Sequence, residues 1–386
     1  EKVLRFKMPQ IPVLYVGRAV EETVCRVLKE SPGFIVAQAP LDTYQPTPLD
    51  DEGRPDRNLG KGWPCEGMLP LFENERPQTA ESLLVWAKAR ARLHYPPVIA
   101  NMKNEWENDE RKAGAWAEVN DERCLNMVDA ALVFHIDEVL RCMAEAPEQV
   151  VNEWRSGTRP EWPAPDGFGY VAFEGGHPLA QEGELSLCES WEVARPWFVG
   201  PDAASFSMNA VHPDHWFQGE YDLVYAWDGG VRIVDLKASL GANDRSGDYV
   251  KQLRIYAMLW YVTHGRKEVV SGLEIWYLGH PSIKSIETPS IAEMERMEQF
   301  LLARWKELKS EPVMREDCPP EPSPMRGFSP GGQSTDAPDG LRCDRCDWRH
   351  VCPSGDGSDD WPLADVVQLP GNMHNTVMTD LSDLDP

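Results

Sequence analysis

Alternation of apolar and polar residues is clearest in the middle of the chain, where it predicts a β-hairpin. Two alternating runs, 221–227 and 231–237, flank the short segment Asp228-Gly229-Gly230. Asp-Gly between two such runs is a strong hairpin signal, because a type I′ turn needs positive φ at both of its central residues. The turn is therefore expected at Asp228-Gly229 or, one residue later, at Gly229-Gly230.

The choice of turn sets which charged residues face each other across the hairpin. The earlier turn places Asp222 directly opposite Asp235, and the later turn places Asp222 opposite Lys237. Like charges on facing positions, about 4.5–5.5 Å apart, are destabilising. A divalent cation bound between the two acids would make their proximity stabilising. Because side chains on a strand repeat every two residues, Asp235 and Lys237 share one face while Leu236 points into the core.

Other stretches on either side of the hairpin follow helical or strand periodicity. Strands are predicted at 184–198 and 269–278. The helix after the hairpin carries Gln252 and Tyr256 on one face, since residues four apart are neighbours on a helix surface. Further helices are predicted at 15–29, at 79–93, at 104–153 with one or more breaks, and at 291–308, with Pro96-Pro97 separating the second from the third.

Shifts in composition along the chain predict five regions. Stretches rich in Pro, Gly, Asp and Ser indicate loops and linkers, and a final acidic stretch with few apolar residues indicates disorder. The regions are an N-terminal helical segment (1–37), a loop insertion with a helical region (38–155), an α/β core (156–310), a linker with a cysteine cluster (311–353) and an acidic tail (354–386).

Length and composition limit the class of protein. A chain of 386 residues, 42% of them hydrophobic, is long enough to bury a sizeable core. No apolar run approaches 18 residues and no signal-peptide pattern occurs, so we expect a soluble, cytoplasmic protein without a membrane span. The formal net charge of −25 disfavours tight nonspecific binding to nucleic acid, because affinity for phosphates comes from Lys and Arg. One candidate basic lining is formed by Lys88, Arg90 and Arg92 in a predicted helix.

Three short motifs follow one another around the hairpin. They are Gly219-x-x-Asp222, Asp235-x-Lys237 and Gln252-x-x-x-Tyr256. An isolated Asp-x-Lys is most often solvent-facing, but the apolar run around this one favours a central strand, where unpaired charge is costly. Together the three motifs resemble the RecB-like branch of the PD-(D/E)XK nucleases. The resemblance implies an α/β fold of restriction-endonuclease type, with a mixed central sheet flanked by helices, an N-terminal helical region and a C-terminal cysteine cluster.

The same resemblance implies metal-dependent hydrolysis of phosphodiester bonds. Asp222, Asp235 and the Leu236 carbonyl would hold Mg²⁺ or Mn²⁺, hard cations that take oxygen ligands. The metal would lower the pKa of a bound water and stabilise charge on the phosphate oxygens. Lys237 would orient the attacking water, and the two helix residues of the third motif would position the phosphate backbone. No covalent enzyme intermediate is implied.

The family also supplies a helical Glu or His before the first core strand, as G-x-x-x-(E/H). Gly114-x-x-x-Glu118 has the glycine and the acid, whereas His135 has apolar flanks but lacks the glycine. A lone helical Glu is usually solvent-facing, and a lone His on an apolar face is usually a core residue. Glu118 is the expected further metal ligand, with His135 as the alternative.

The nine cysteines are unevenly spread, and three of them form a C-x2-C-x5-C pattern near the end of the chain. Such short spacing favours a metal site over a disulfide framework. Tetrahedral zinc or a cubane cluster normally takes four ligands, and His350 could supply the fourth ligand to zinc. The three cysteines are Cys343, Cys346 and Cys352.

The spacing resembles the C-terminal clamp of iron–sulfur RecB-type nucleases, which include AddB and the exonuclease of the CRISPR adaptation machinery. In that branch the fourth cysteine lies far upstream, and a [4Fe-4S] cluster ties the two ends of the domain together. Cys25 matches by its place near the N-terminus and is the expected fourth ligand, with Cys318 as the competitor. Closing so long a loop constrains the unfolded chain strongly in an entropic model.

The resemblance favours a single-strand DNA exonuclease of repair, recombination or CRISPR adaptation. No helicase motif occurs in the sequence, so any unwinding would come from a helicase or recombination partner. One rival is a non-catalytic DNA- or partner-binding protein with a nuclease-like fold and a structural zinc site; another is a metallohydrolase that acts on nucleotides. The acidic charge favours the rivals, and the complete motif set favours the nuclease more strongly.

Overall fold

The computed structural model describes the chain in segments that are separated by gaps. The described residues are 10–34, 71–109, 112, 115–157, 176–177, 179–198, 209–238 and 246–310. Most of the predicted loop insertion after residue 37, the linker with the cysteine cluster (311–353) and the acidic tail (354–386) lie outside the described residues.

The described segments contain both helices and strands. The helices are α1 (Pro12–Lys29), η2 (Glu73–Glu75), α2 (Ala80–Asn108), η3 (Trp116–Glu118), α3 (Asp121–Glu145), α4 (Glu148–Arg155), α5 (Leu187–Ala194), α6 (Ser246–Thr263) and α7 (Ile291–Ser310). The strands are β1 (Trp197–Phe198), β2 (Asn209–Val211), β3 (Gln218–Glu220), β4 (Leu223–Tyr225), β5 (Arg232–Lys237), β6 (Gly272–Tyr277) and β7 (Ser282–Ile286). The helices predicted at 15–29 and 291–308 and the strand predicted at 269–278 are confirmed as α1, α7 and β6. None of these described helices is long and apolar enough to cross a membrane.

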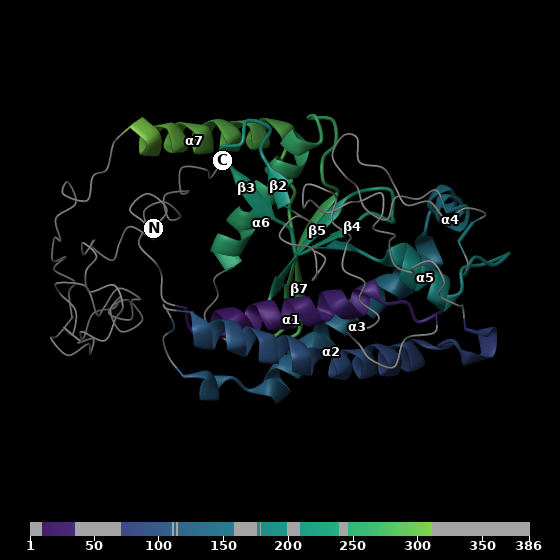
Figure 1. Ribbon diagram of the computed structural model, residues 1–386. Helices are drawn as coiled ribbons and strands as arrows, with labels where there is room; N and C mark the ends of the chain where they lie inside the picture. The colour runs from purple at the N-terminus through teal and green to yellow at the C-terminus, as the bar shows by residue number, and fades with distance from the viewer. Residues whose placement is uncertain are drawn as a thin grey trace, which may run out of the picture. The chain divides into compact units, whose positions relative to one another are not determined.

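Five strands form a mixed sheet in the order β1-β4-β5-β6-β7. Strand β5 lies in the middle, antiparallel to β4 and parallel to β6. A parallel neighbour needs a long crossover, which α6 provides between β5 and β6. Helices α1 and α3 lie on one side of the sheet and α6 on the other (Figure 1). The architecture is the predicted α/β fold with a mixed central sheet flanked by helices.

The central hairpin has the register predicted for the earlier of the two turns. Strands β4 and β5 pair Leu223 with Val234. The same register, extended by one residue, places Asp222 opposite Asp235. The pairing of residues 223–225 confirms the register of the earlier turn, whereas Asp222 itself lies just outside the ladder.

The turn of this hairpin is wider than predicted. The ladder ends where Tyr225 pairs with Arg232. Gly229 has a φ of +85°, but Asp228 is not among the residues with positive φ, so the predicted type I′ turn is wrong. Asp228 Oδ1 instead accepts a hydrogen bond of 3.2 Å from the backbone N–H of Gly230. The side chain of Asp228 thus stabilises a looser turn without changing the register of the strands.

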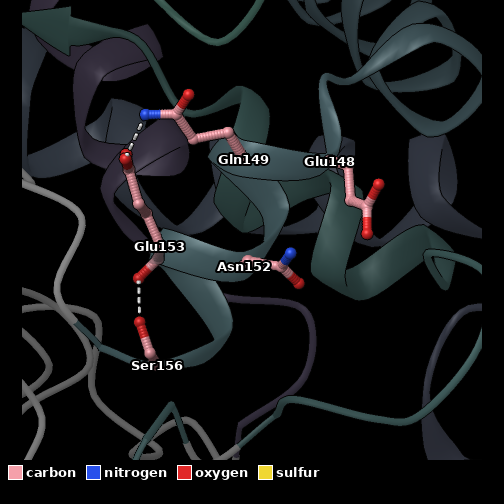
Figure 2. Close-up of a pocket in the computed structure, with 5 residues that line it drawn as sticks. All are labelled: Glu148, Gln149, Asn152, Glu153 and Ser156. Carbon is pink, nitrogen blue, oxygen red and sulfur yellow. Dashed lines mark hydrogen bonds between the residues drawn. The ribbon is translucent and has the colours of Figure 1, made fainter.

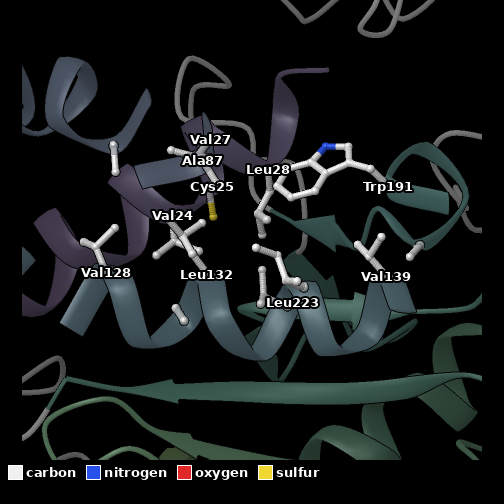
Figure 3. Packing of buried hydrophobic residues seen from close by; sticks show 14 of the residues in the cluster. Val24, Cys25, Val27, Leu28, Ala87, Val128, Leu132, Val139, Trp191 and Leu223 are labelled. Carbon is white, nitrogen blue, oxygen red and sulfur yellow. The ribbon is translucent and has the colours of Figure 1, made fainter. Parts of the chain in front are cut away.

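One face of the sheet packs against α1, α2, α3 and α5. The core there consists of small and branched apolar side chains from the helices and from β4, β5 and β6. Trp191 of α5 is fully buried within it. Figure 3 shows the helical and strand side chains that meet in this cluster, among them Val24, Leu28, Val128, Leu132, Val139, Trp191 and Leu223.

The strand predicted at 184–198 is wrong over most of its length, because these residues form α5. Ser186 Oγ accepts a hydrogen bond from the N–H of Glu189, and Glu189 Oε2 accepts one from the N–H of Ser186. This reciprocal pair is a capping box, a Ser-x-x-Glu signal that starts a helix whatever the β-propensity of the residues that follow. The sheet receives Trp197–Phe198 as β1.

Helix α2 continues through Pro96-Pro97, where a break was predicted. A proline inside a helix removes a backbone donor and crowds the preceding turn, at a cost of about 3 kcal/mol. Tyr95 precedes the prolines and Val98 and Met102 follow them, and all three are buried. Burial of apolar side chains on both sides of the prolines offsets the local cost.

The chain divides into two compact units. The larger contains residues 16–102 and 119–299, which include the whole sheet, and the smaller contains 1–15, 103–118 and 300–386. In the smaller unit, Trp106 Nε1 donates a hydrogen bond of 2.8 Å to the carbonyl oxygen of Gln10. The ring of Trp106 also packs against Trp116, with 5.6 Å between the ring centroids.

Candidate active site

The central strand β5 presents an acid and a lysine from one face near its carboxyl end. Asp235 is 2% exposed, and Lys237 is half-buried. Lys237 Nζ lies 2.6 Å from Asp235 Oδ2. Burial alone would lower the pKa of Lys237, but the Asp235 carboxylate outweighs it and raises that pKa, so the ammonium stays charged. The two residues form a buried ion pair in the middle of the sheet.

Asp222 lies in the short link between β3 and β4, and its side chain reaches the same face of the sheet. Its Oδ2 accepts a hydrogen bond of 2.6 Å from the backbone N–H of Leu236 in β5. Burial raises the pKa of Asp222 well above its usual range, and the negative charges of Glu21 and Asp235 raise it further. The hydrogen bond to Leu236 therefore holds a carboxylate where two other acids oppose its ionisation.

Helix α1 contributes the third acid, Glu21. Burial, together with the charges of Glu220 and Asp235, raises the pKa of Glu21 from its ordinary 4.5 to about 7, and Lys237 opposes that rise. Glu21 in turn raises the pKa of Asp222. Acids held together at such a cost are typical of functional sites.

Glu21 is the site residue that sequence analysis missed, although a signal for it is present. Gly17 and Glu21 form a G-x-x-x-E pattern inside the first predicted helix. The prediction named Glu118 and His135 instead. The proximity of α1 to β5 depends on long-range packing, which the pattern alone does not contain.

Helix α6 places two polar side chains next to the lysine. Gln252 Oε1 accepts a hydrogen bond of 3.4 Å from Lys237 Nζ, and Gln252 Nε2 donates one of 2.7 Å to Tyr256 OH. The two α6 residues are one turn apart on the same helix face. A continuous polar chain thus runs from Asp235 through Lys237 and Gln252 to Tyr256.

Gly219 allows β3 to lie directly against α6. A Cβ on Gly219 would lie 2.8 Å from Leu259 Cδ1 and 3.1 Å from Tyr256 Cε1. The first distance is shorter than real contacts permit, so a side chain here would force either Leu259 or β3 to shift. Because β3 leads directly into Asp222, the glycine of the first motif fixes the position of its aspartate.

The acids have the chemistry of an open divalent-cation site. Asp235 Oδ2 accepts no hydrogen bond of good geometry from the described residues, although the Lys237 ammonium lies close to it. No three His, Cys, Asp or Glu side chains in the described segments converge closely enough to form a complete metal-binding group. Mg²⁺ is commonly held by one or two carboxylates, with waters and substrate phosphates as its other ligands. Asp222 and Asp235, with Glu21 nearby, fit that kind of site.

The two helical ligands predicted from the sequence lie in different units. Glu118 ends η3 in the smaller unit, and its role as a ligand stays a prediction. His135 lies in the core of the larger unit, where its Nδ1 is 3.0 Å from Tyr225 OH and its ring packs edge-on against Trp191. Burial lowers the pKa of His135 to about 3. The described contacts of His135 are those of a neutral core residue, not of a partner to the acids on β5.

The role of Cys25 as the distant cluster ligand stays a prediction, and its surroundings in the described residues are apolar. Its side chain is 2% exposed and lies in the apolar cluster with Leu28 and Leu132 (Figure 3). Burial raises the pKa of the Cys25 thiol well above its usual range, and two acids of the site, Glu21 and Asp222, raise it further. A cluster is held by thiolates, which this environment disfavours. The other proposed ligands of the cluster, Cys343, Cys346, Cys352, Cys318 and His350, lie outside the described residues.

The three residues of the basic lining predicted on α2 share two acids, and the lining itself stays a prediction. Lys88 Nζ lies 3.2 Å from Asp129 Oδ2, and Arg92 also pairs with Asp129. Arg90 is buried and pairs with Glu30 through two hydrogen bonds. These ion pairs tie α2 to its neighbouring helices, and Lys88 and Arg92 remain partly exposed.

A shallow depression beside α4 contains none of the motif residues (Figure 2). Gln149 Nε2 donates a hydrogen bond of 2.8 Å to Glu153 Oε1, and Ser156 Oγ donates one of 3.0 Å to the Glu153 carbonyl. These two hydrogen bonds lie within one helix and its C-cap. The residues that line it are Glu148, Gln149, Asn152, Glu153 and Ser156.

A mixed sheet whose central strand carries Asp-x-Lys, faced by a second aspartate and a helical glutamate, defines a nuclease core of restriction-endonuclease type. The model of the PD-(D/E)XK nuclease superfamily matches residues 102–353. This match spans more than half of the chain, and the chain belongs to the PD-(D/E)XK nuclease superfamily. No curated protein and no solved structure was found to match it. The matched range includes the three sequence motifs and the clustered cysteines, and α1 with Glu21 precedes it.

Proposed function

We propose that the chain is a divalent-metal-dependent nuclease that hydrolyses phosphodiester bonds of DNA with Glu21, Asp222, Asp235 and Lys237. The observation that carries this proposal is the hydrogen bond of Asp222 to the N–H of Leu236, which lies between the buried pair Asp235 and Lys237 on β5, with the charge of Glu21 acting on that site. Burial raises the pKa of Glu21 to about 7, and repulsion from Glu220 and Asp235 contributes to the rise. A bound cation would offset that repulsion, and membership of the superfamily supports the assignment.

In the proposed mechanism the acids hold Mg²⁺ or Mn²⁺, with the Leu236 carbonyl as a further ligand. The ion, when bound, supplies an activated water and neutralises charge on the phosphate. Lys237 stays protonated because of Asp235 and donates to the attacking water or to a phosphate oxygen. Gln252 orients the ammonium through its Oε1, and Tyr256 extends the polar chain toward the phosphate backbone.

We further propose that the protein is a RecB-like, cytoplasmic exonuclease that acts on single-stranded DNA. The three motifs in the order of that branch support this assignment. Repair, recombination or CRISPR adaptation would supply such a substrate, with a helicase or recombination partner to unwind duplex DNA. The net charge of −25 supports a substrate that is engaged at the site rather than across a broad basic surface.

Asp222→Asn and Lys237→Ala are each expected to reduce DNA cleavage by roughly 10³-fold, because the site loses a metal ligand or its cation. Cleavage of labelled single-stranded and duplex DNA is measured with Mg²⁺ and with Mn²⁺, and circular dichroism checks the fold. Lys284→Ala, in the exposed strand β7, is the matched lysine control. Cleavage at the wild-type rate by both site variants would overturn the proposal. DNA binding without cleavage by the wild-type protein would favour the non-catalytic rival.

Gly219→Ala is expected to lower cleavage by up to roughly 100-fold, because a misplacement of about 1 Å can cost that much. The added Cβ would overlap Leu259 and displace Asp222, and we expect the free energy of unfolding to fall by about 1–3 kcal/mol. The control is Gly247→Ala in α6, where an added Cβ meets nothing within 4 Å. Urea unfolding and cleavage rates are compared for both variants. A Gly219→Ala protein as active and stable as the control would contradict the inference that only a glycine fits between β3 and α6.

For the cysteine cluster, we propose a metal centre whose fourth ligand is Cys318 or His350 rather than Cys25. The burial of the Cys25 thiol among apolar side chains supports this choice. Iron, sulfide and zinc are measured after anaerobic purification of the wild-type, Cys25→Ala and Cys346→Ser proteins. We expect Cys346→Ser to lose metal and Cys25→Ala to keep it, whether the centre is [4Fe-4S] or zinc. Loss of metal in the Cys25→Ala protein would instead show that Cys25 is the fourth ligand.

A further inference from the structure

A tyrosine outside the three sequence motifs lies against the lysine of the site. Lys237 Nζ is 4.7 Å from the ring centroid of Tyr249, in the first turn of α6. Tyr249 and Gln252 are three residues apart, so their side chains share one face of the helix. That face of α6 therefore brings both an aromatic ring and an amide to a single ammonium.

The sheet supports the ring of Tyr249 from the side of β6. The register of β5 and β6 pairs Lys237 with Tyr277. The ring centroids of Tyr249 and Tyr277 are 6.5 Å apart, and their planes are inclined by 51°. Inclined rings at such a separation attract each other. The residue beside the lysine in the sheet thus packs against the ring that contacts the lysine.

The contacts of the ammonium leave one of its donors for a substrate. Asp235 Oδ2 lies 2.6 Å from Lys237 Nζ, and Gln252 Oε1 lies 3.4 Å from it. An ammonium has three N–H donors, so two oxygens use at most two of them. The face of an aromatic ring attracts a cation through its quadrupole and needs no hydrogen bond to do so. Tyr249 therefore adds attraction without using the third donor.

Asp235 alone does not suffice to hold the ammonium during the proposed reaction. It is a proposed metal ligand, so its carboxylate would be shared between Lys237 and a divalent cation, and the two cations repel each other. The side chain of Lys237 is 17% exposed, and a cation–π contact is stronger when it is desolvated. The ring of Tyr249 holds Lys237 by an attraction that the metal does not compete for.

We propose that Tyr249 is a positioning residue, whose ring keeps the Lys237 ammonium in place for the substrate phosphate while Asp235 serves the metal. The inference rests on the proposed nuclease function and assigns that site a further residue. Tyr249 acts through Lys237 and supplies no ligand to the metal. Its ring, and not its hydroxyl group, carries the effect.

NMR of the full chain, labelled with ¹³C at the lysine ε-carbons, tests the contact without any cleavage. The Lys237 signal is the one that Lys237→Arg removes. Protons that lie over a ring face are shifted upfield by the ring current. We therefore expect Tyr249→Leu and Tyr249→Met to move the Lys237 Hε signal downfield, and Tyr249→Phe to leave it in place. A signal that stays unmoved in the Leu and Met variants would overturn the contact.

Cleavage of labelled single-stranded DNA with Mn²⁺ tests the consequence of the contact. Tyr249→Leu is expected to lower kcat roughly tenfold with little change in KM, because Lys237 acts on the transition state rather than on binding. A tenfold loss corresponds to about 1.4 kcal/mol, which a partly desolvated cation–π contact can supply. Tyr249→Phe keeps the ring and is expected to cleave within about twofold of the wild-type rate.

Phe300→Leu on α7 is the matched control, because the half-buried ring of Phe300 has the Arg304 guanidinium 5.4 Å from its centroid. This variant removes a cation–π contact outside the motifs and should keep wild-type kcat. A Tyr249→Leu protein with wild-type kcat would overturn the positioning role, as would a Tyr249→Phe protein as slow as Tyr249→Leu. A wild-type protein that cuts no DNA, with the Lys237 signal moved by Tyr249→Leu, would instead overturn the nuclease assignment and uphold the ring as the group that holds the ammonium.

Discussion

Glu21→Gln is expected to reduce metal-dependent cleavage by roughly 100-fold or more while making the metal-free protein more stable. Mutation of a residue that only hydrogen-bonds to a metal ligand typically lowers metal affinity or activity by about 10–100-fold. Removal of the proposed ligand Glu21 should lower activity by at least as much. Without a cation, the Glu21 carboxylate opposes the charges of Asp222 and Asp235. Removing it should raise the free energy of unfolding by about 1 kcal/mol, a shift of roughly 2–4 °C in Tm.

Two other glutamates provide the controls for this prediction. Glu22 lies next to Glu21 on α1 but bonds to Arg26 one turn later, so Glu22→Gln should keep full activity. Glu118→Gln tests the helical ligand that the sequence predicts. If Glu21 is the helical ligand, the Glu118→Gln protein should also keep full activity. Cleavage by Glu21→Gln at the wild-type rate, with loss in Glu118→Gln, would reverse the assignment.

Because the pKa of Glu21 is raised, the effect of Glu21→Gln on the stability of the metal-free protein should depend on pH. The unfolded chain loses this proton near 4.5, whereas the folded protein keeps it up to about 7. Between these values the folded state binds more protons, so the contribution of Glu21 to stability falls as pH rises from about 4.5 to 7. In EDTA, Glu21→Gln and wild type should melt alike near about pH 5, and the variant should be the more stable near about pH 8. A Tm difference that does not change with pH would contradict the burial of this carboxylate among other acids.

Relations between site residues that are close in the sequence could be predicted from the sequence. The period of two along β5 fixes Asp235 and Lys237 to one face, and the hairpin register adds Asp222 because it depends on residues within one turn. The spacing of four fixes Gln252 and Tyr256 to one face of α6. Each of these relations is set by the repeat of a single element or by one turn between neighbours.

The part that depends on assembly does not follow from the sequence. Glu21 reaches β5 because α1 packs on the sheet, and many helical acids share its local pattern. The capping box at Ser186 and Glu189 outweighed the β-propensity of α5, and packing around Tyr95 carried α2 through two prolines. In each case a tertiary contact or a cap decided between local alternatives that propensity left close in free energy.

Glu30→Ala is expected to lower the free energy of unfolding by about 3–5 kcal/mol, since removing one partner of a buried ion pair leaves the other charge uncompensated. Glu30 ends the segment that carries Glu21 and is 1% exposed. Its Oε1 lies 2.7 Å from Arg90 Nη2 and 2.6 Å from His94 Nε2, both on α2. Its carbonyl oxygen accepts a hydrogen bond of 2.9 Å from Trp191 Nε1 on α5. These bonds fix the end of α1 against two other helices.

Urea unfolding at neutral pH measures this cost, with Glu22→Ala as the control on the same helix. Glu22 pairs with Arg26 within α1, and such a pair contributes about 0.3–0.5 kcal/mol. Because α1 also positions Glu21, Glu30→Ala should weaken Mn²⁺ binding as well, whereas Glu22→Ala should not. Equal unfolding free energies for the two variants would mean that α1 is held by its apolar face alone. Packing of Val24 and Leu28, rather than buried charge, would then be what places Glu21 beside the central strand.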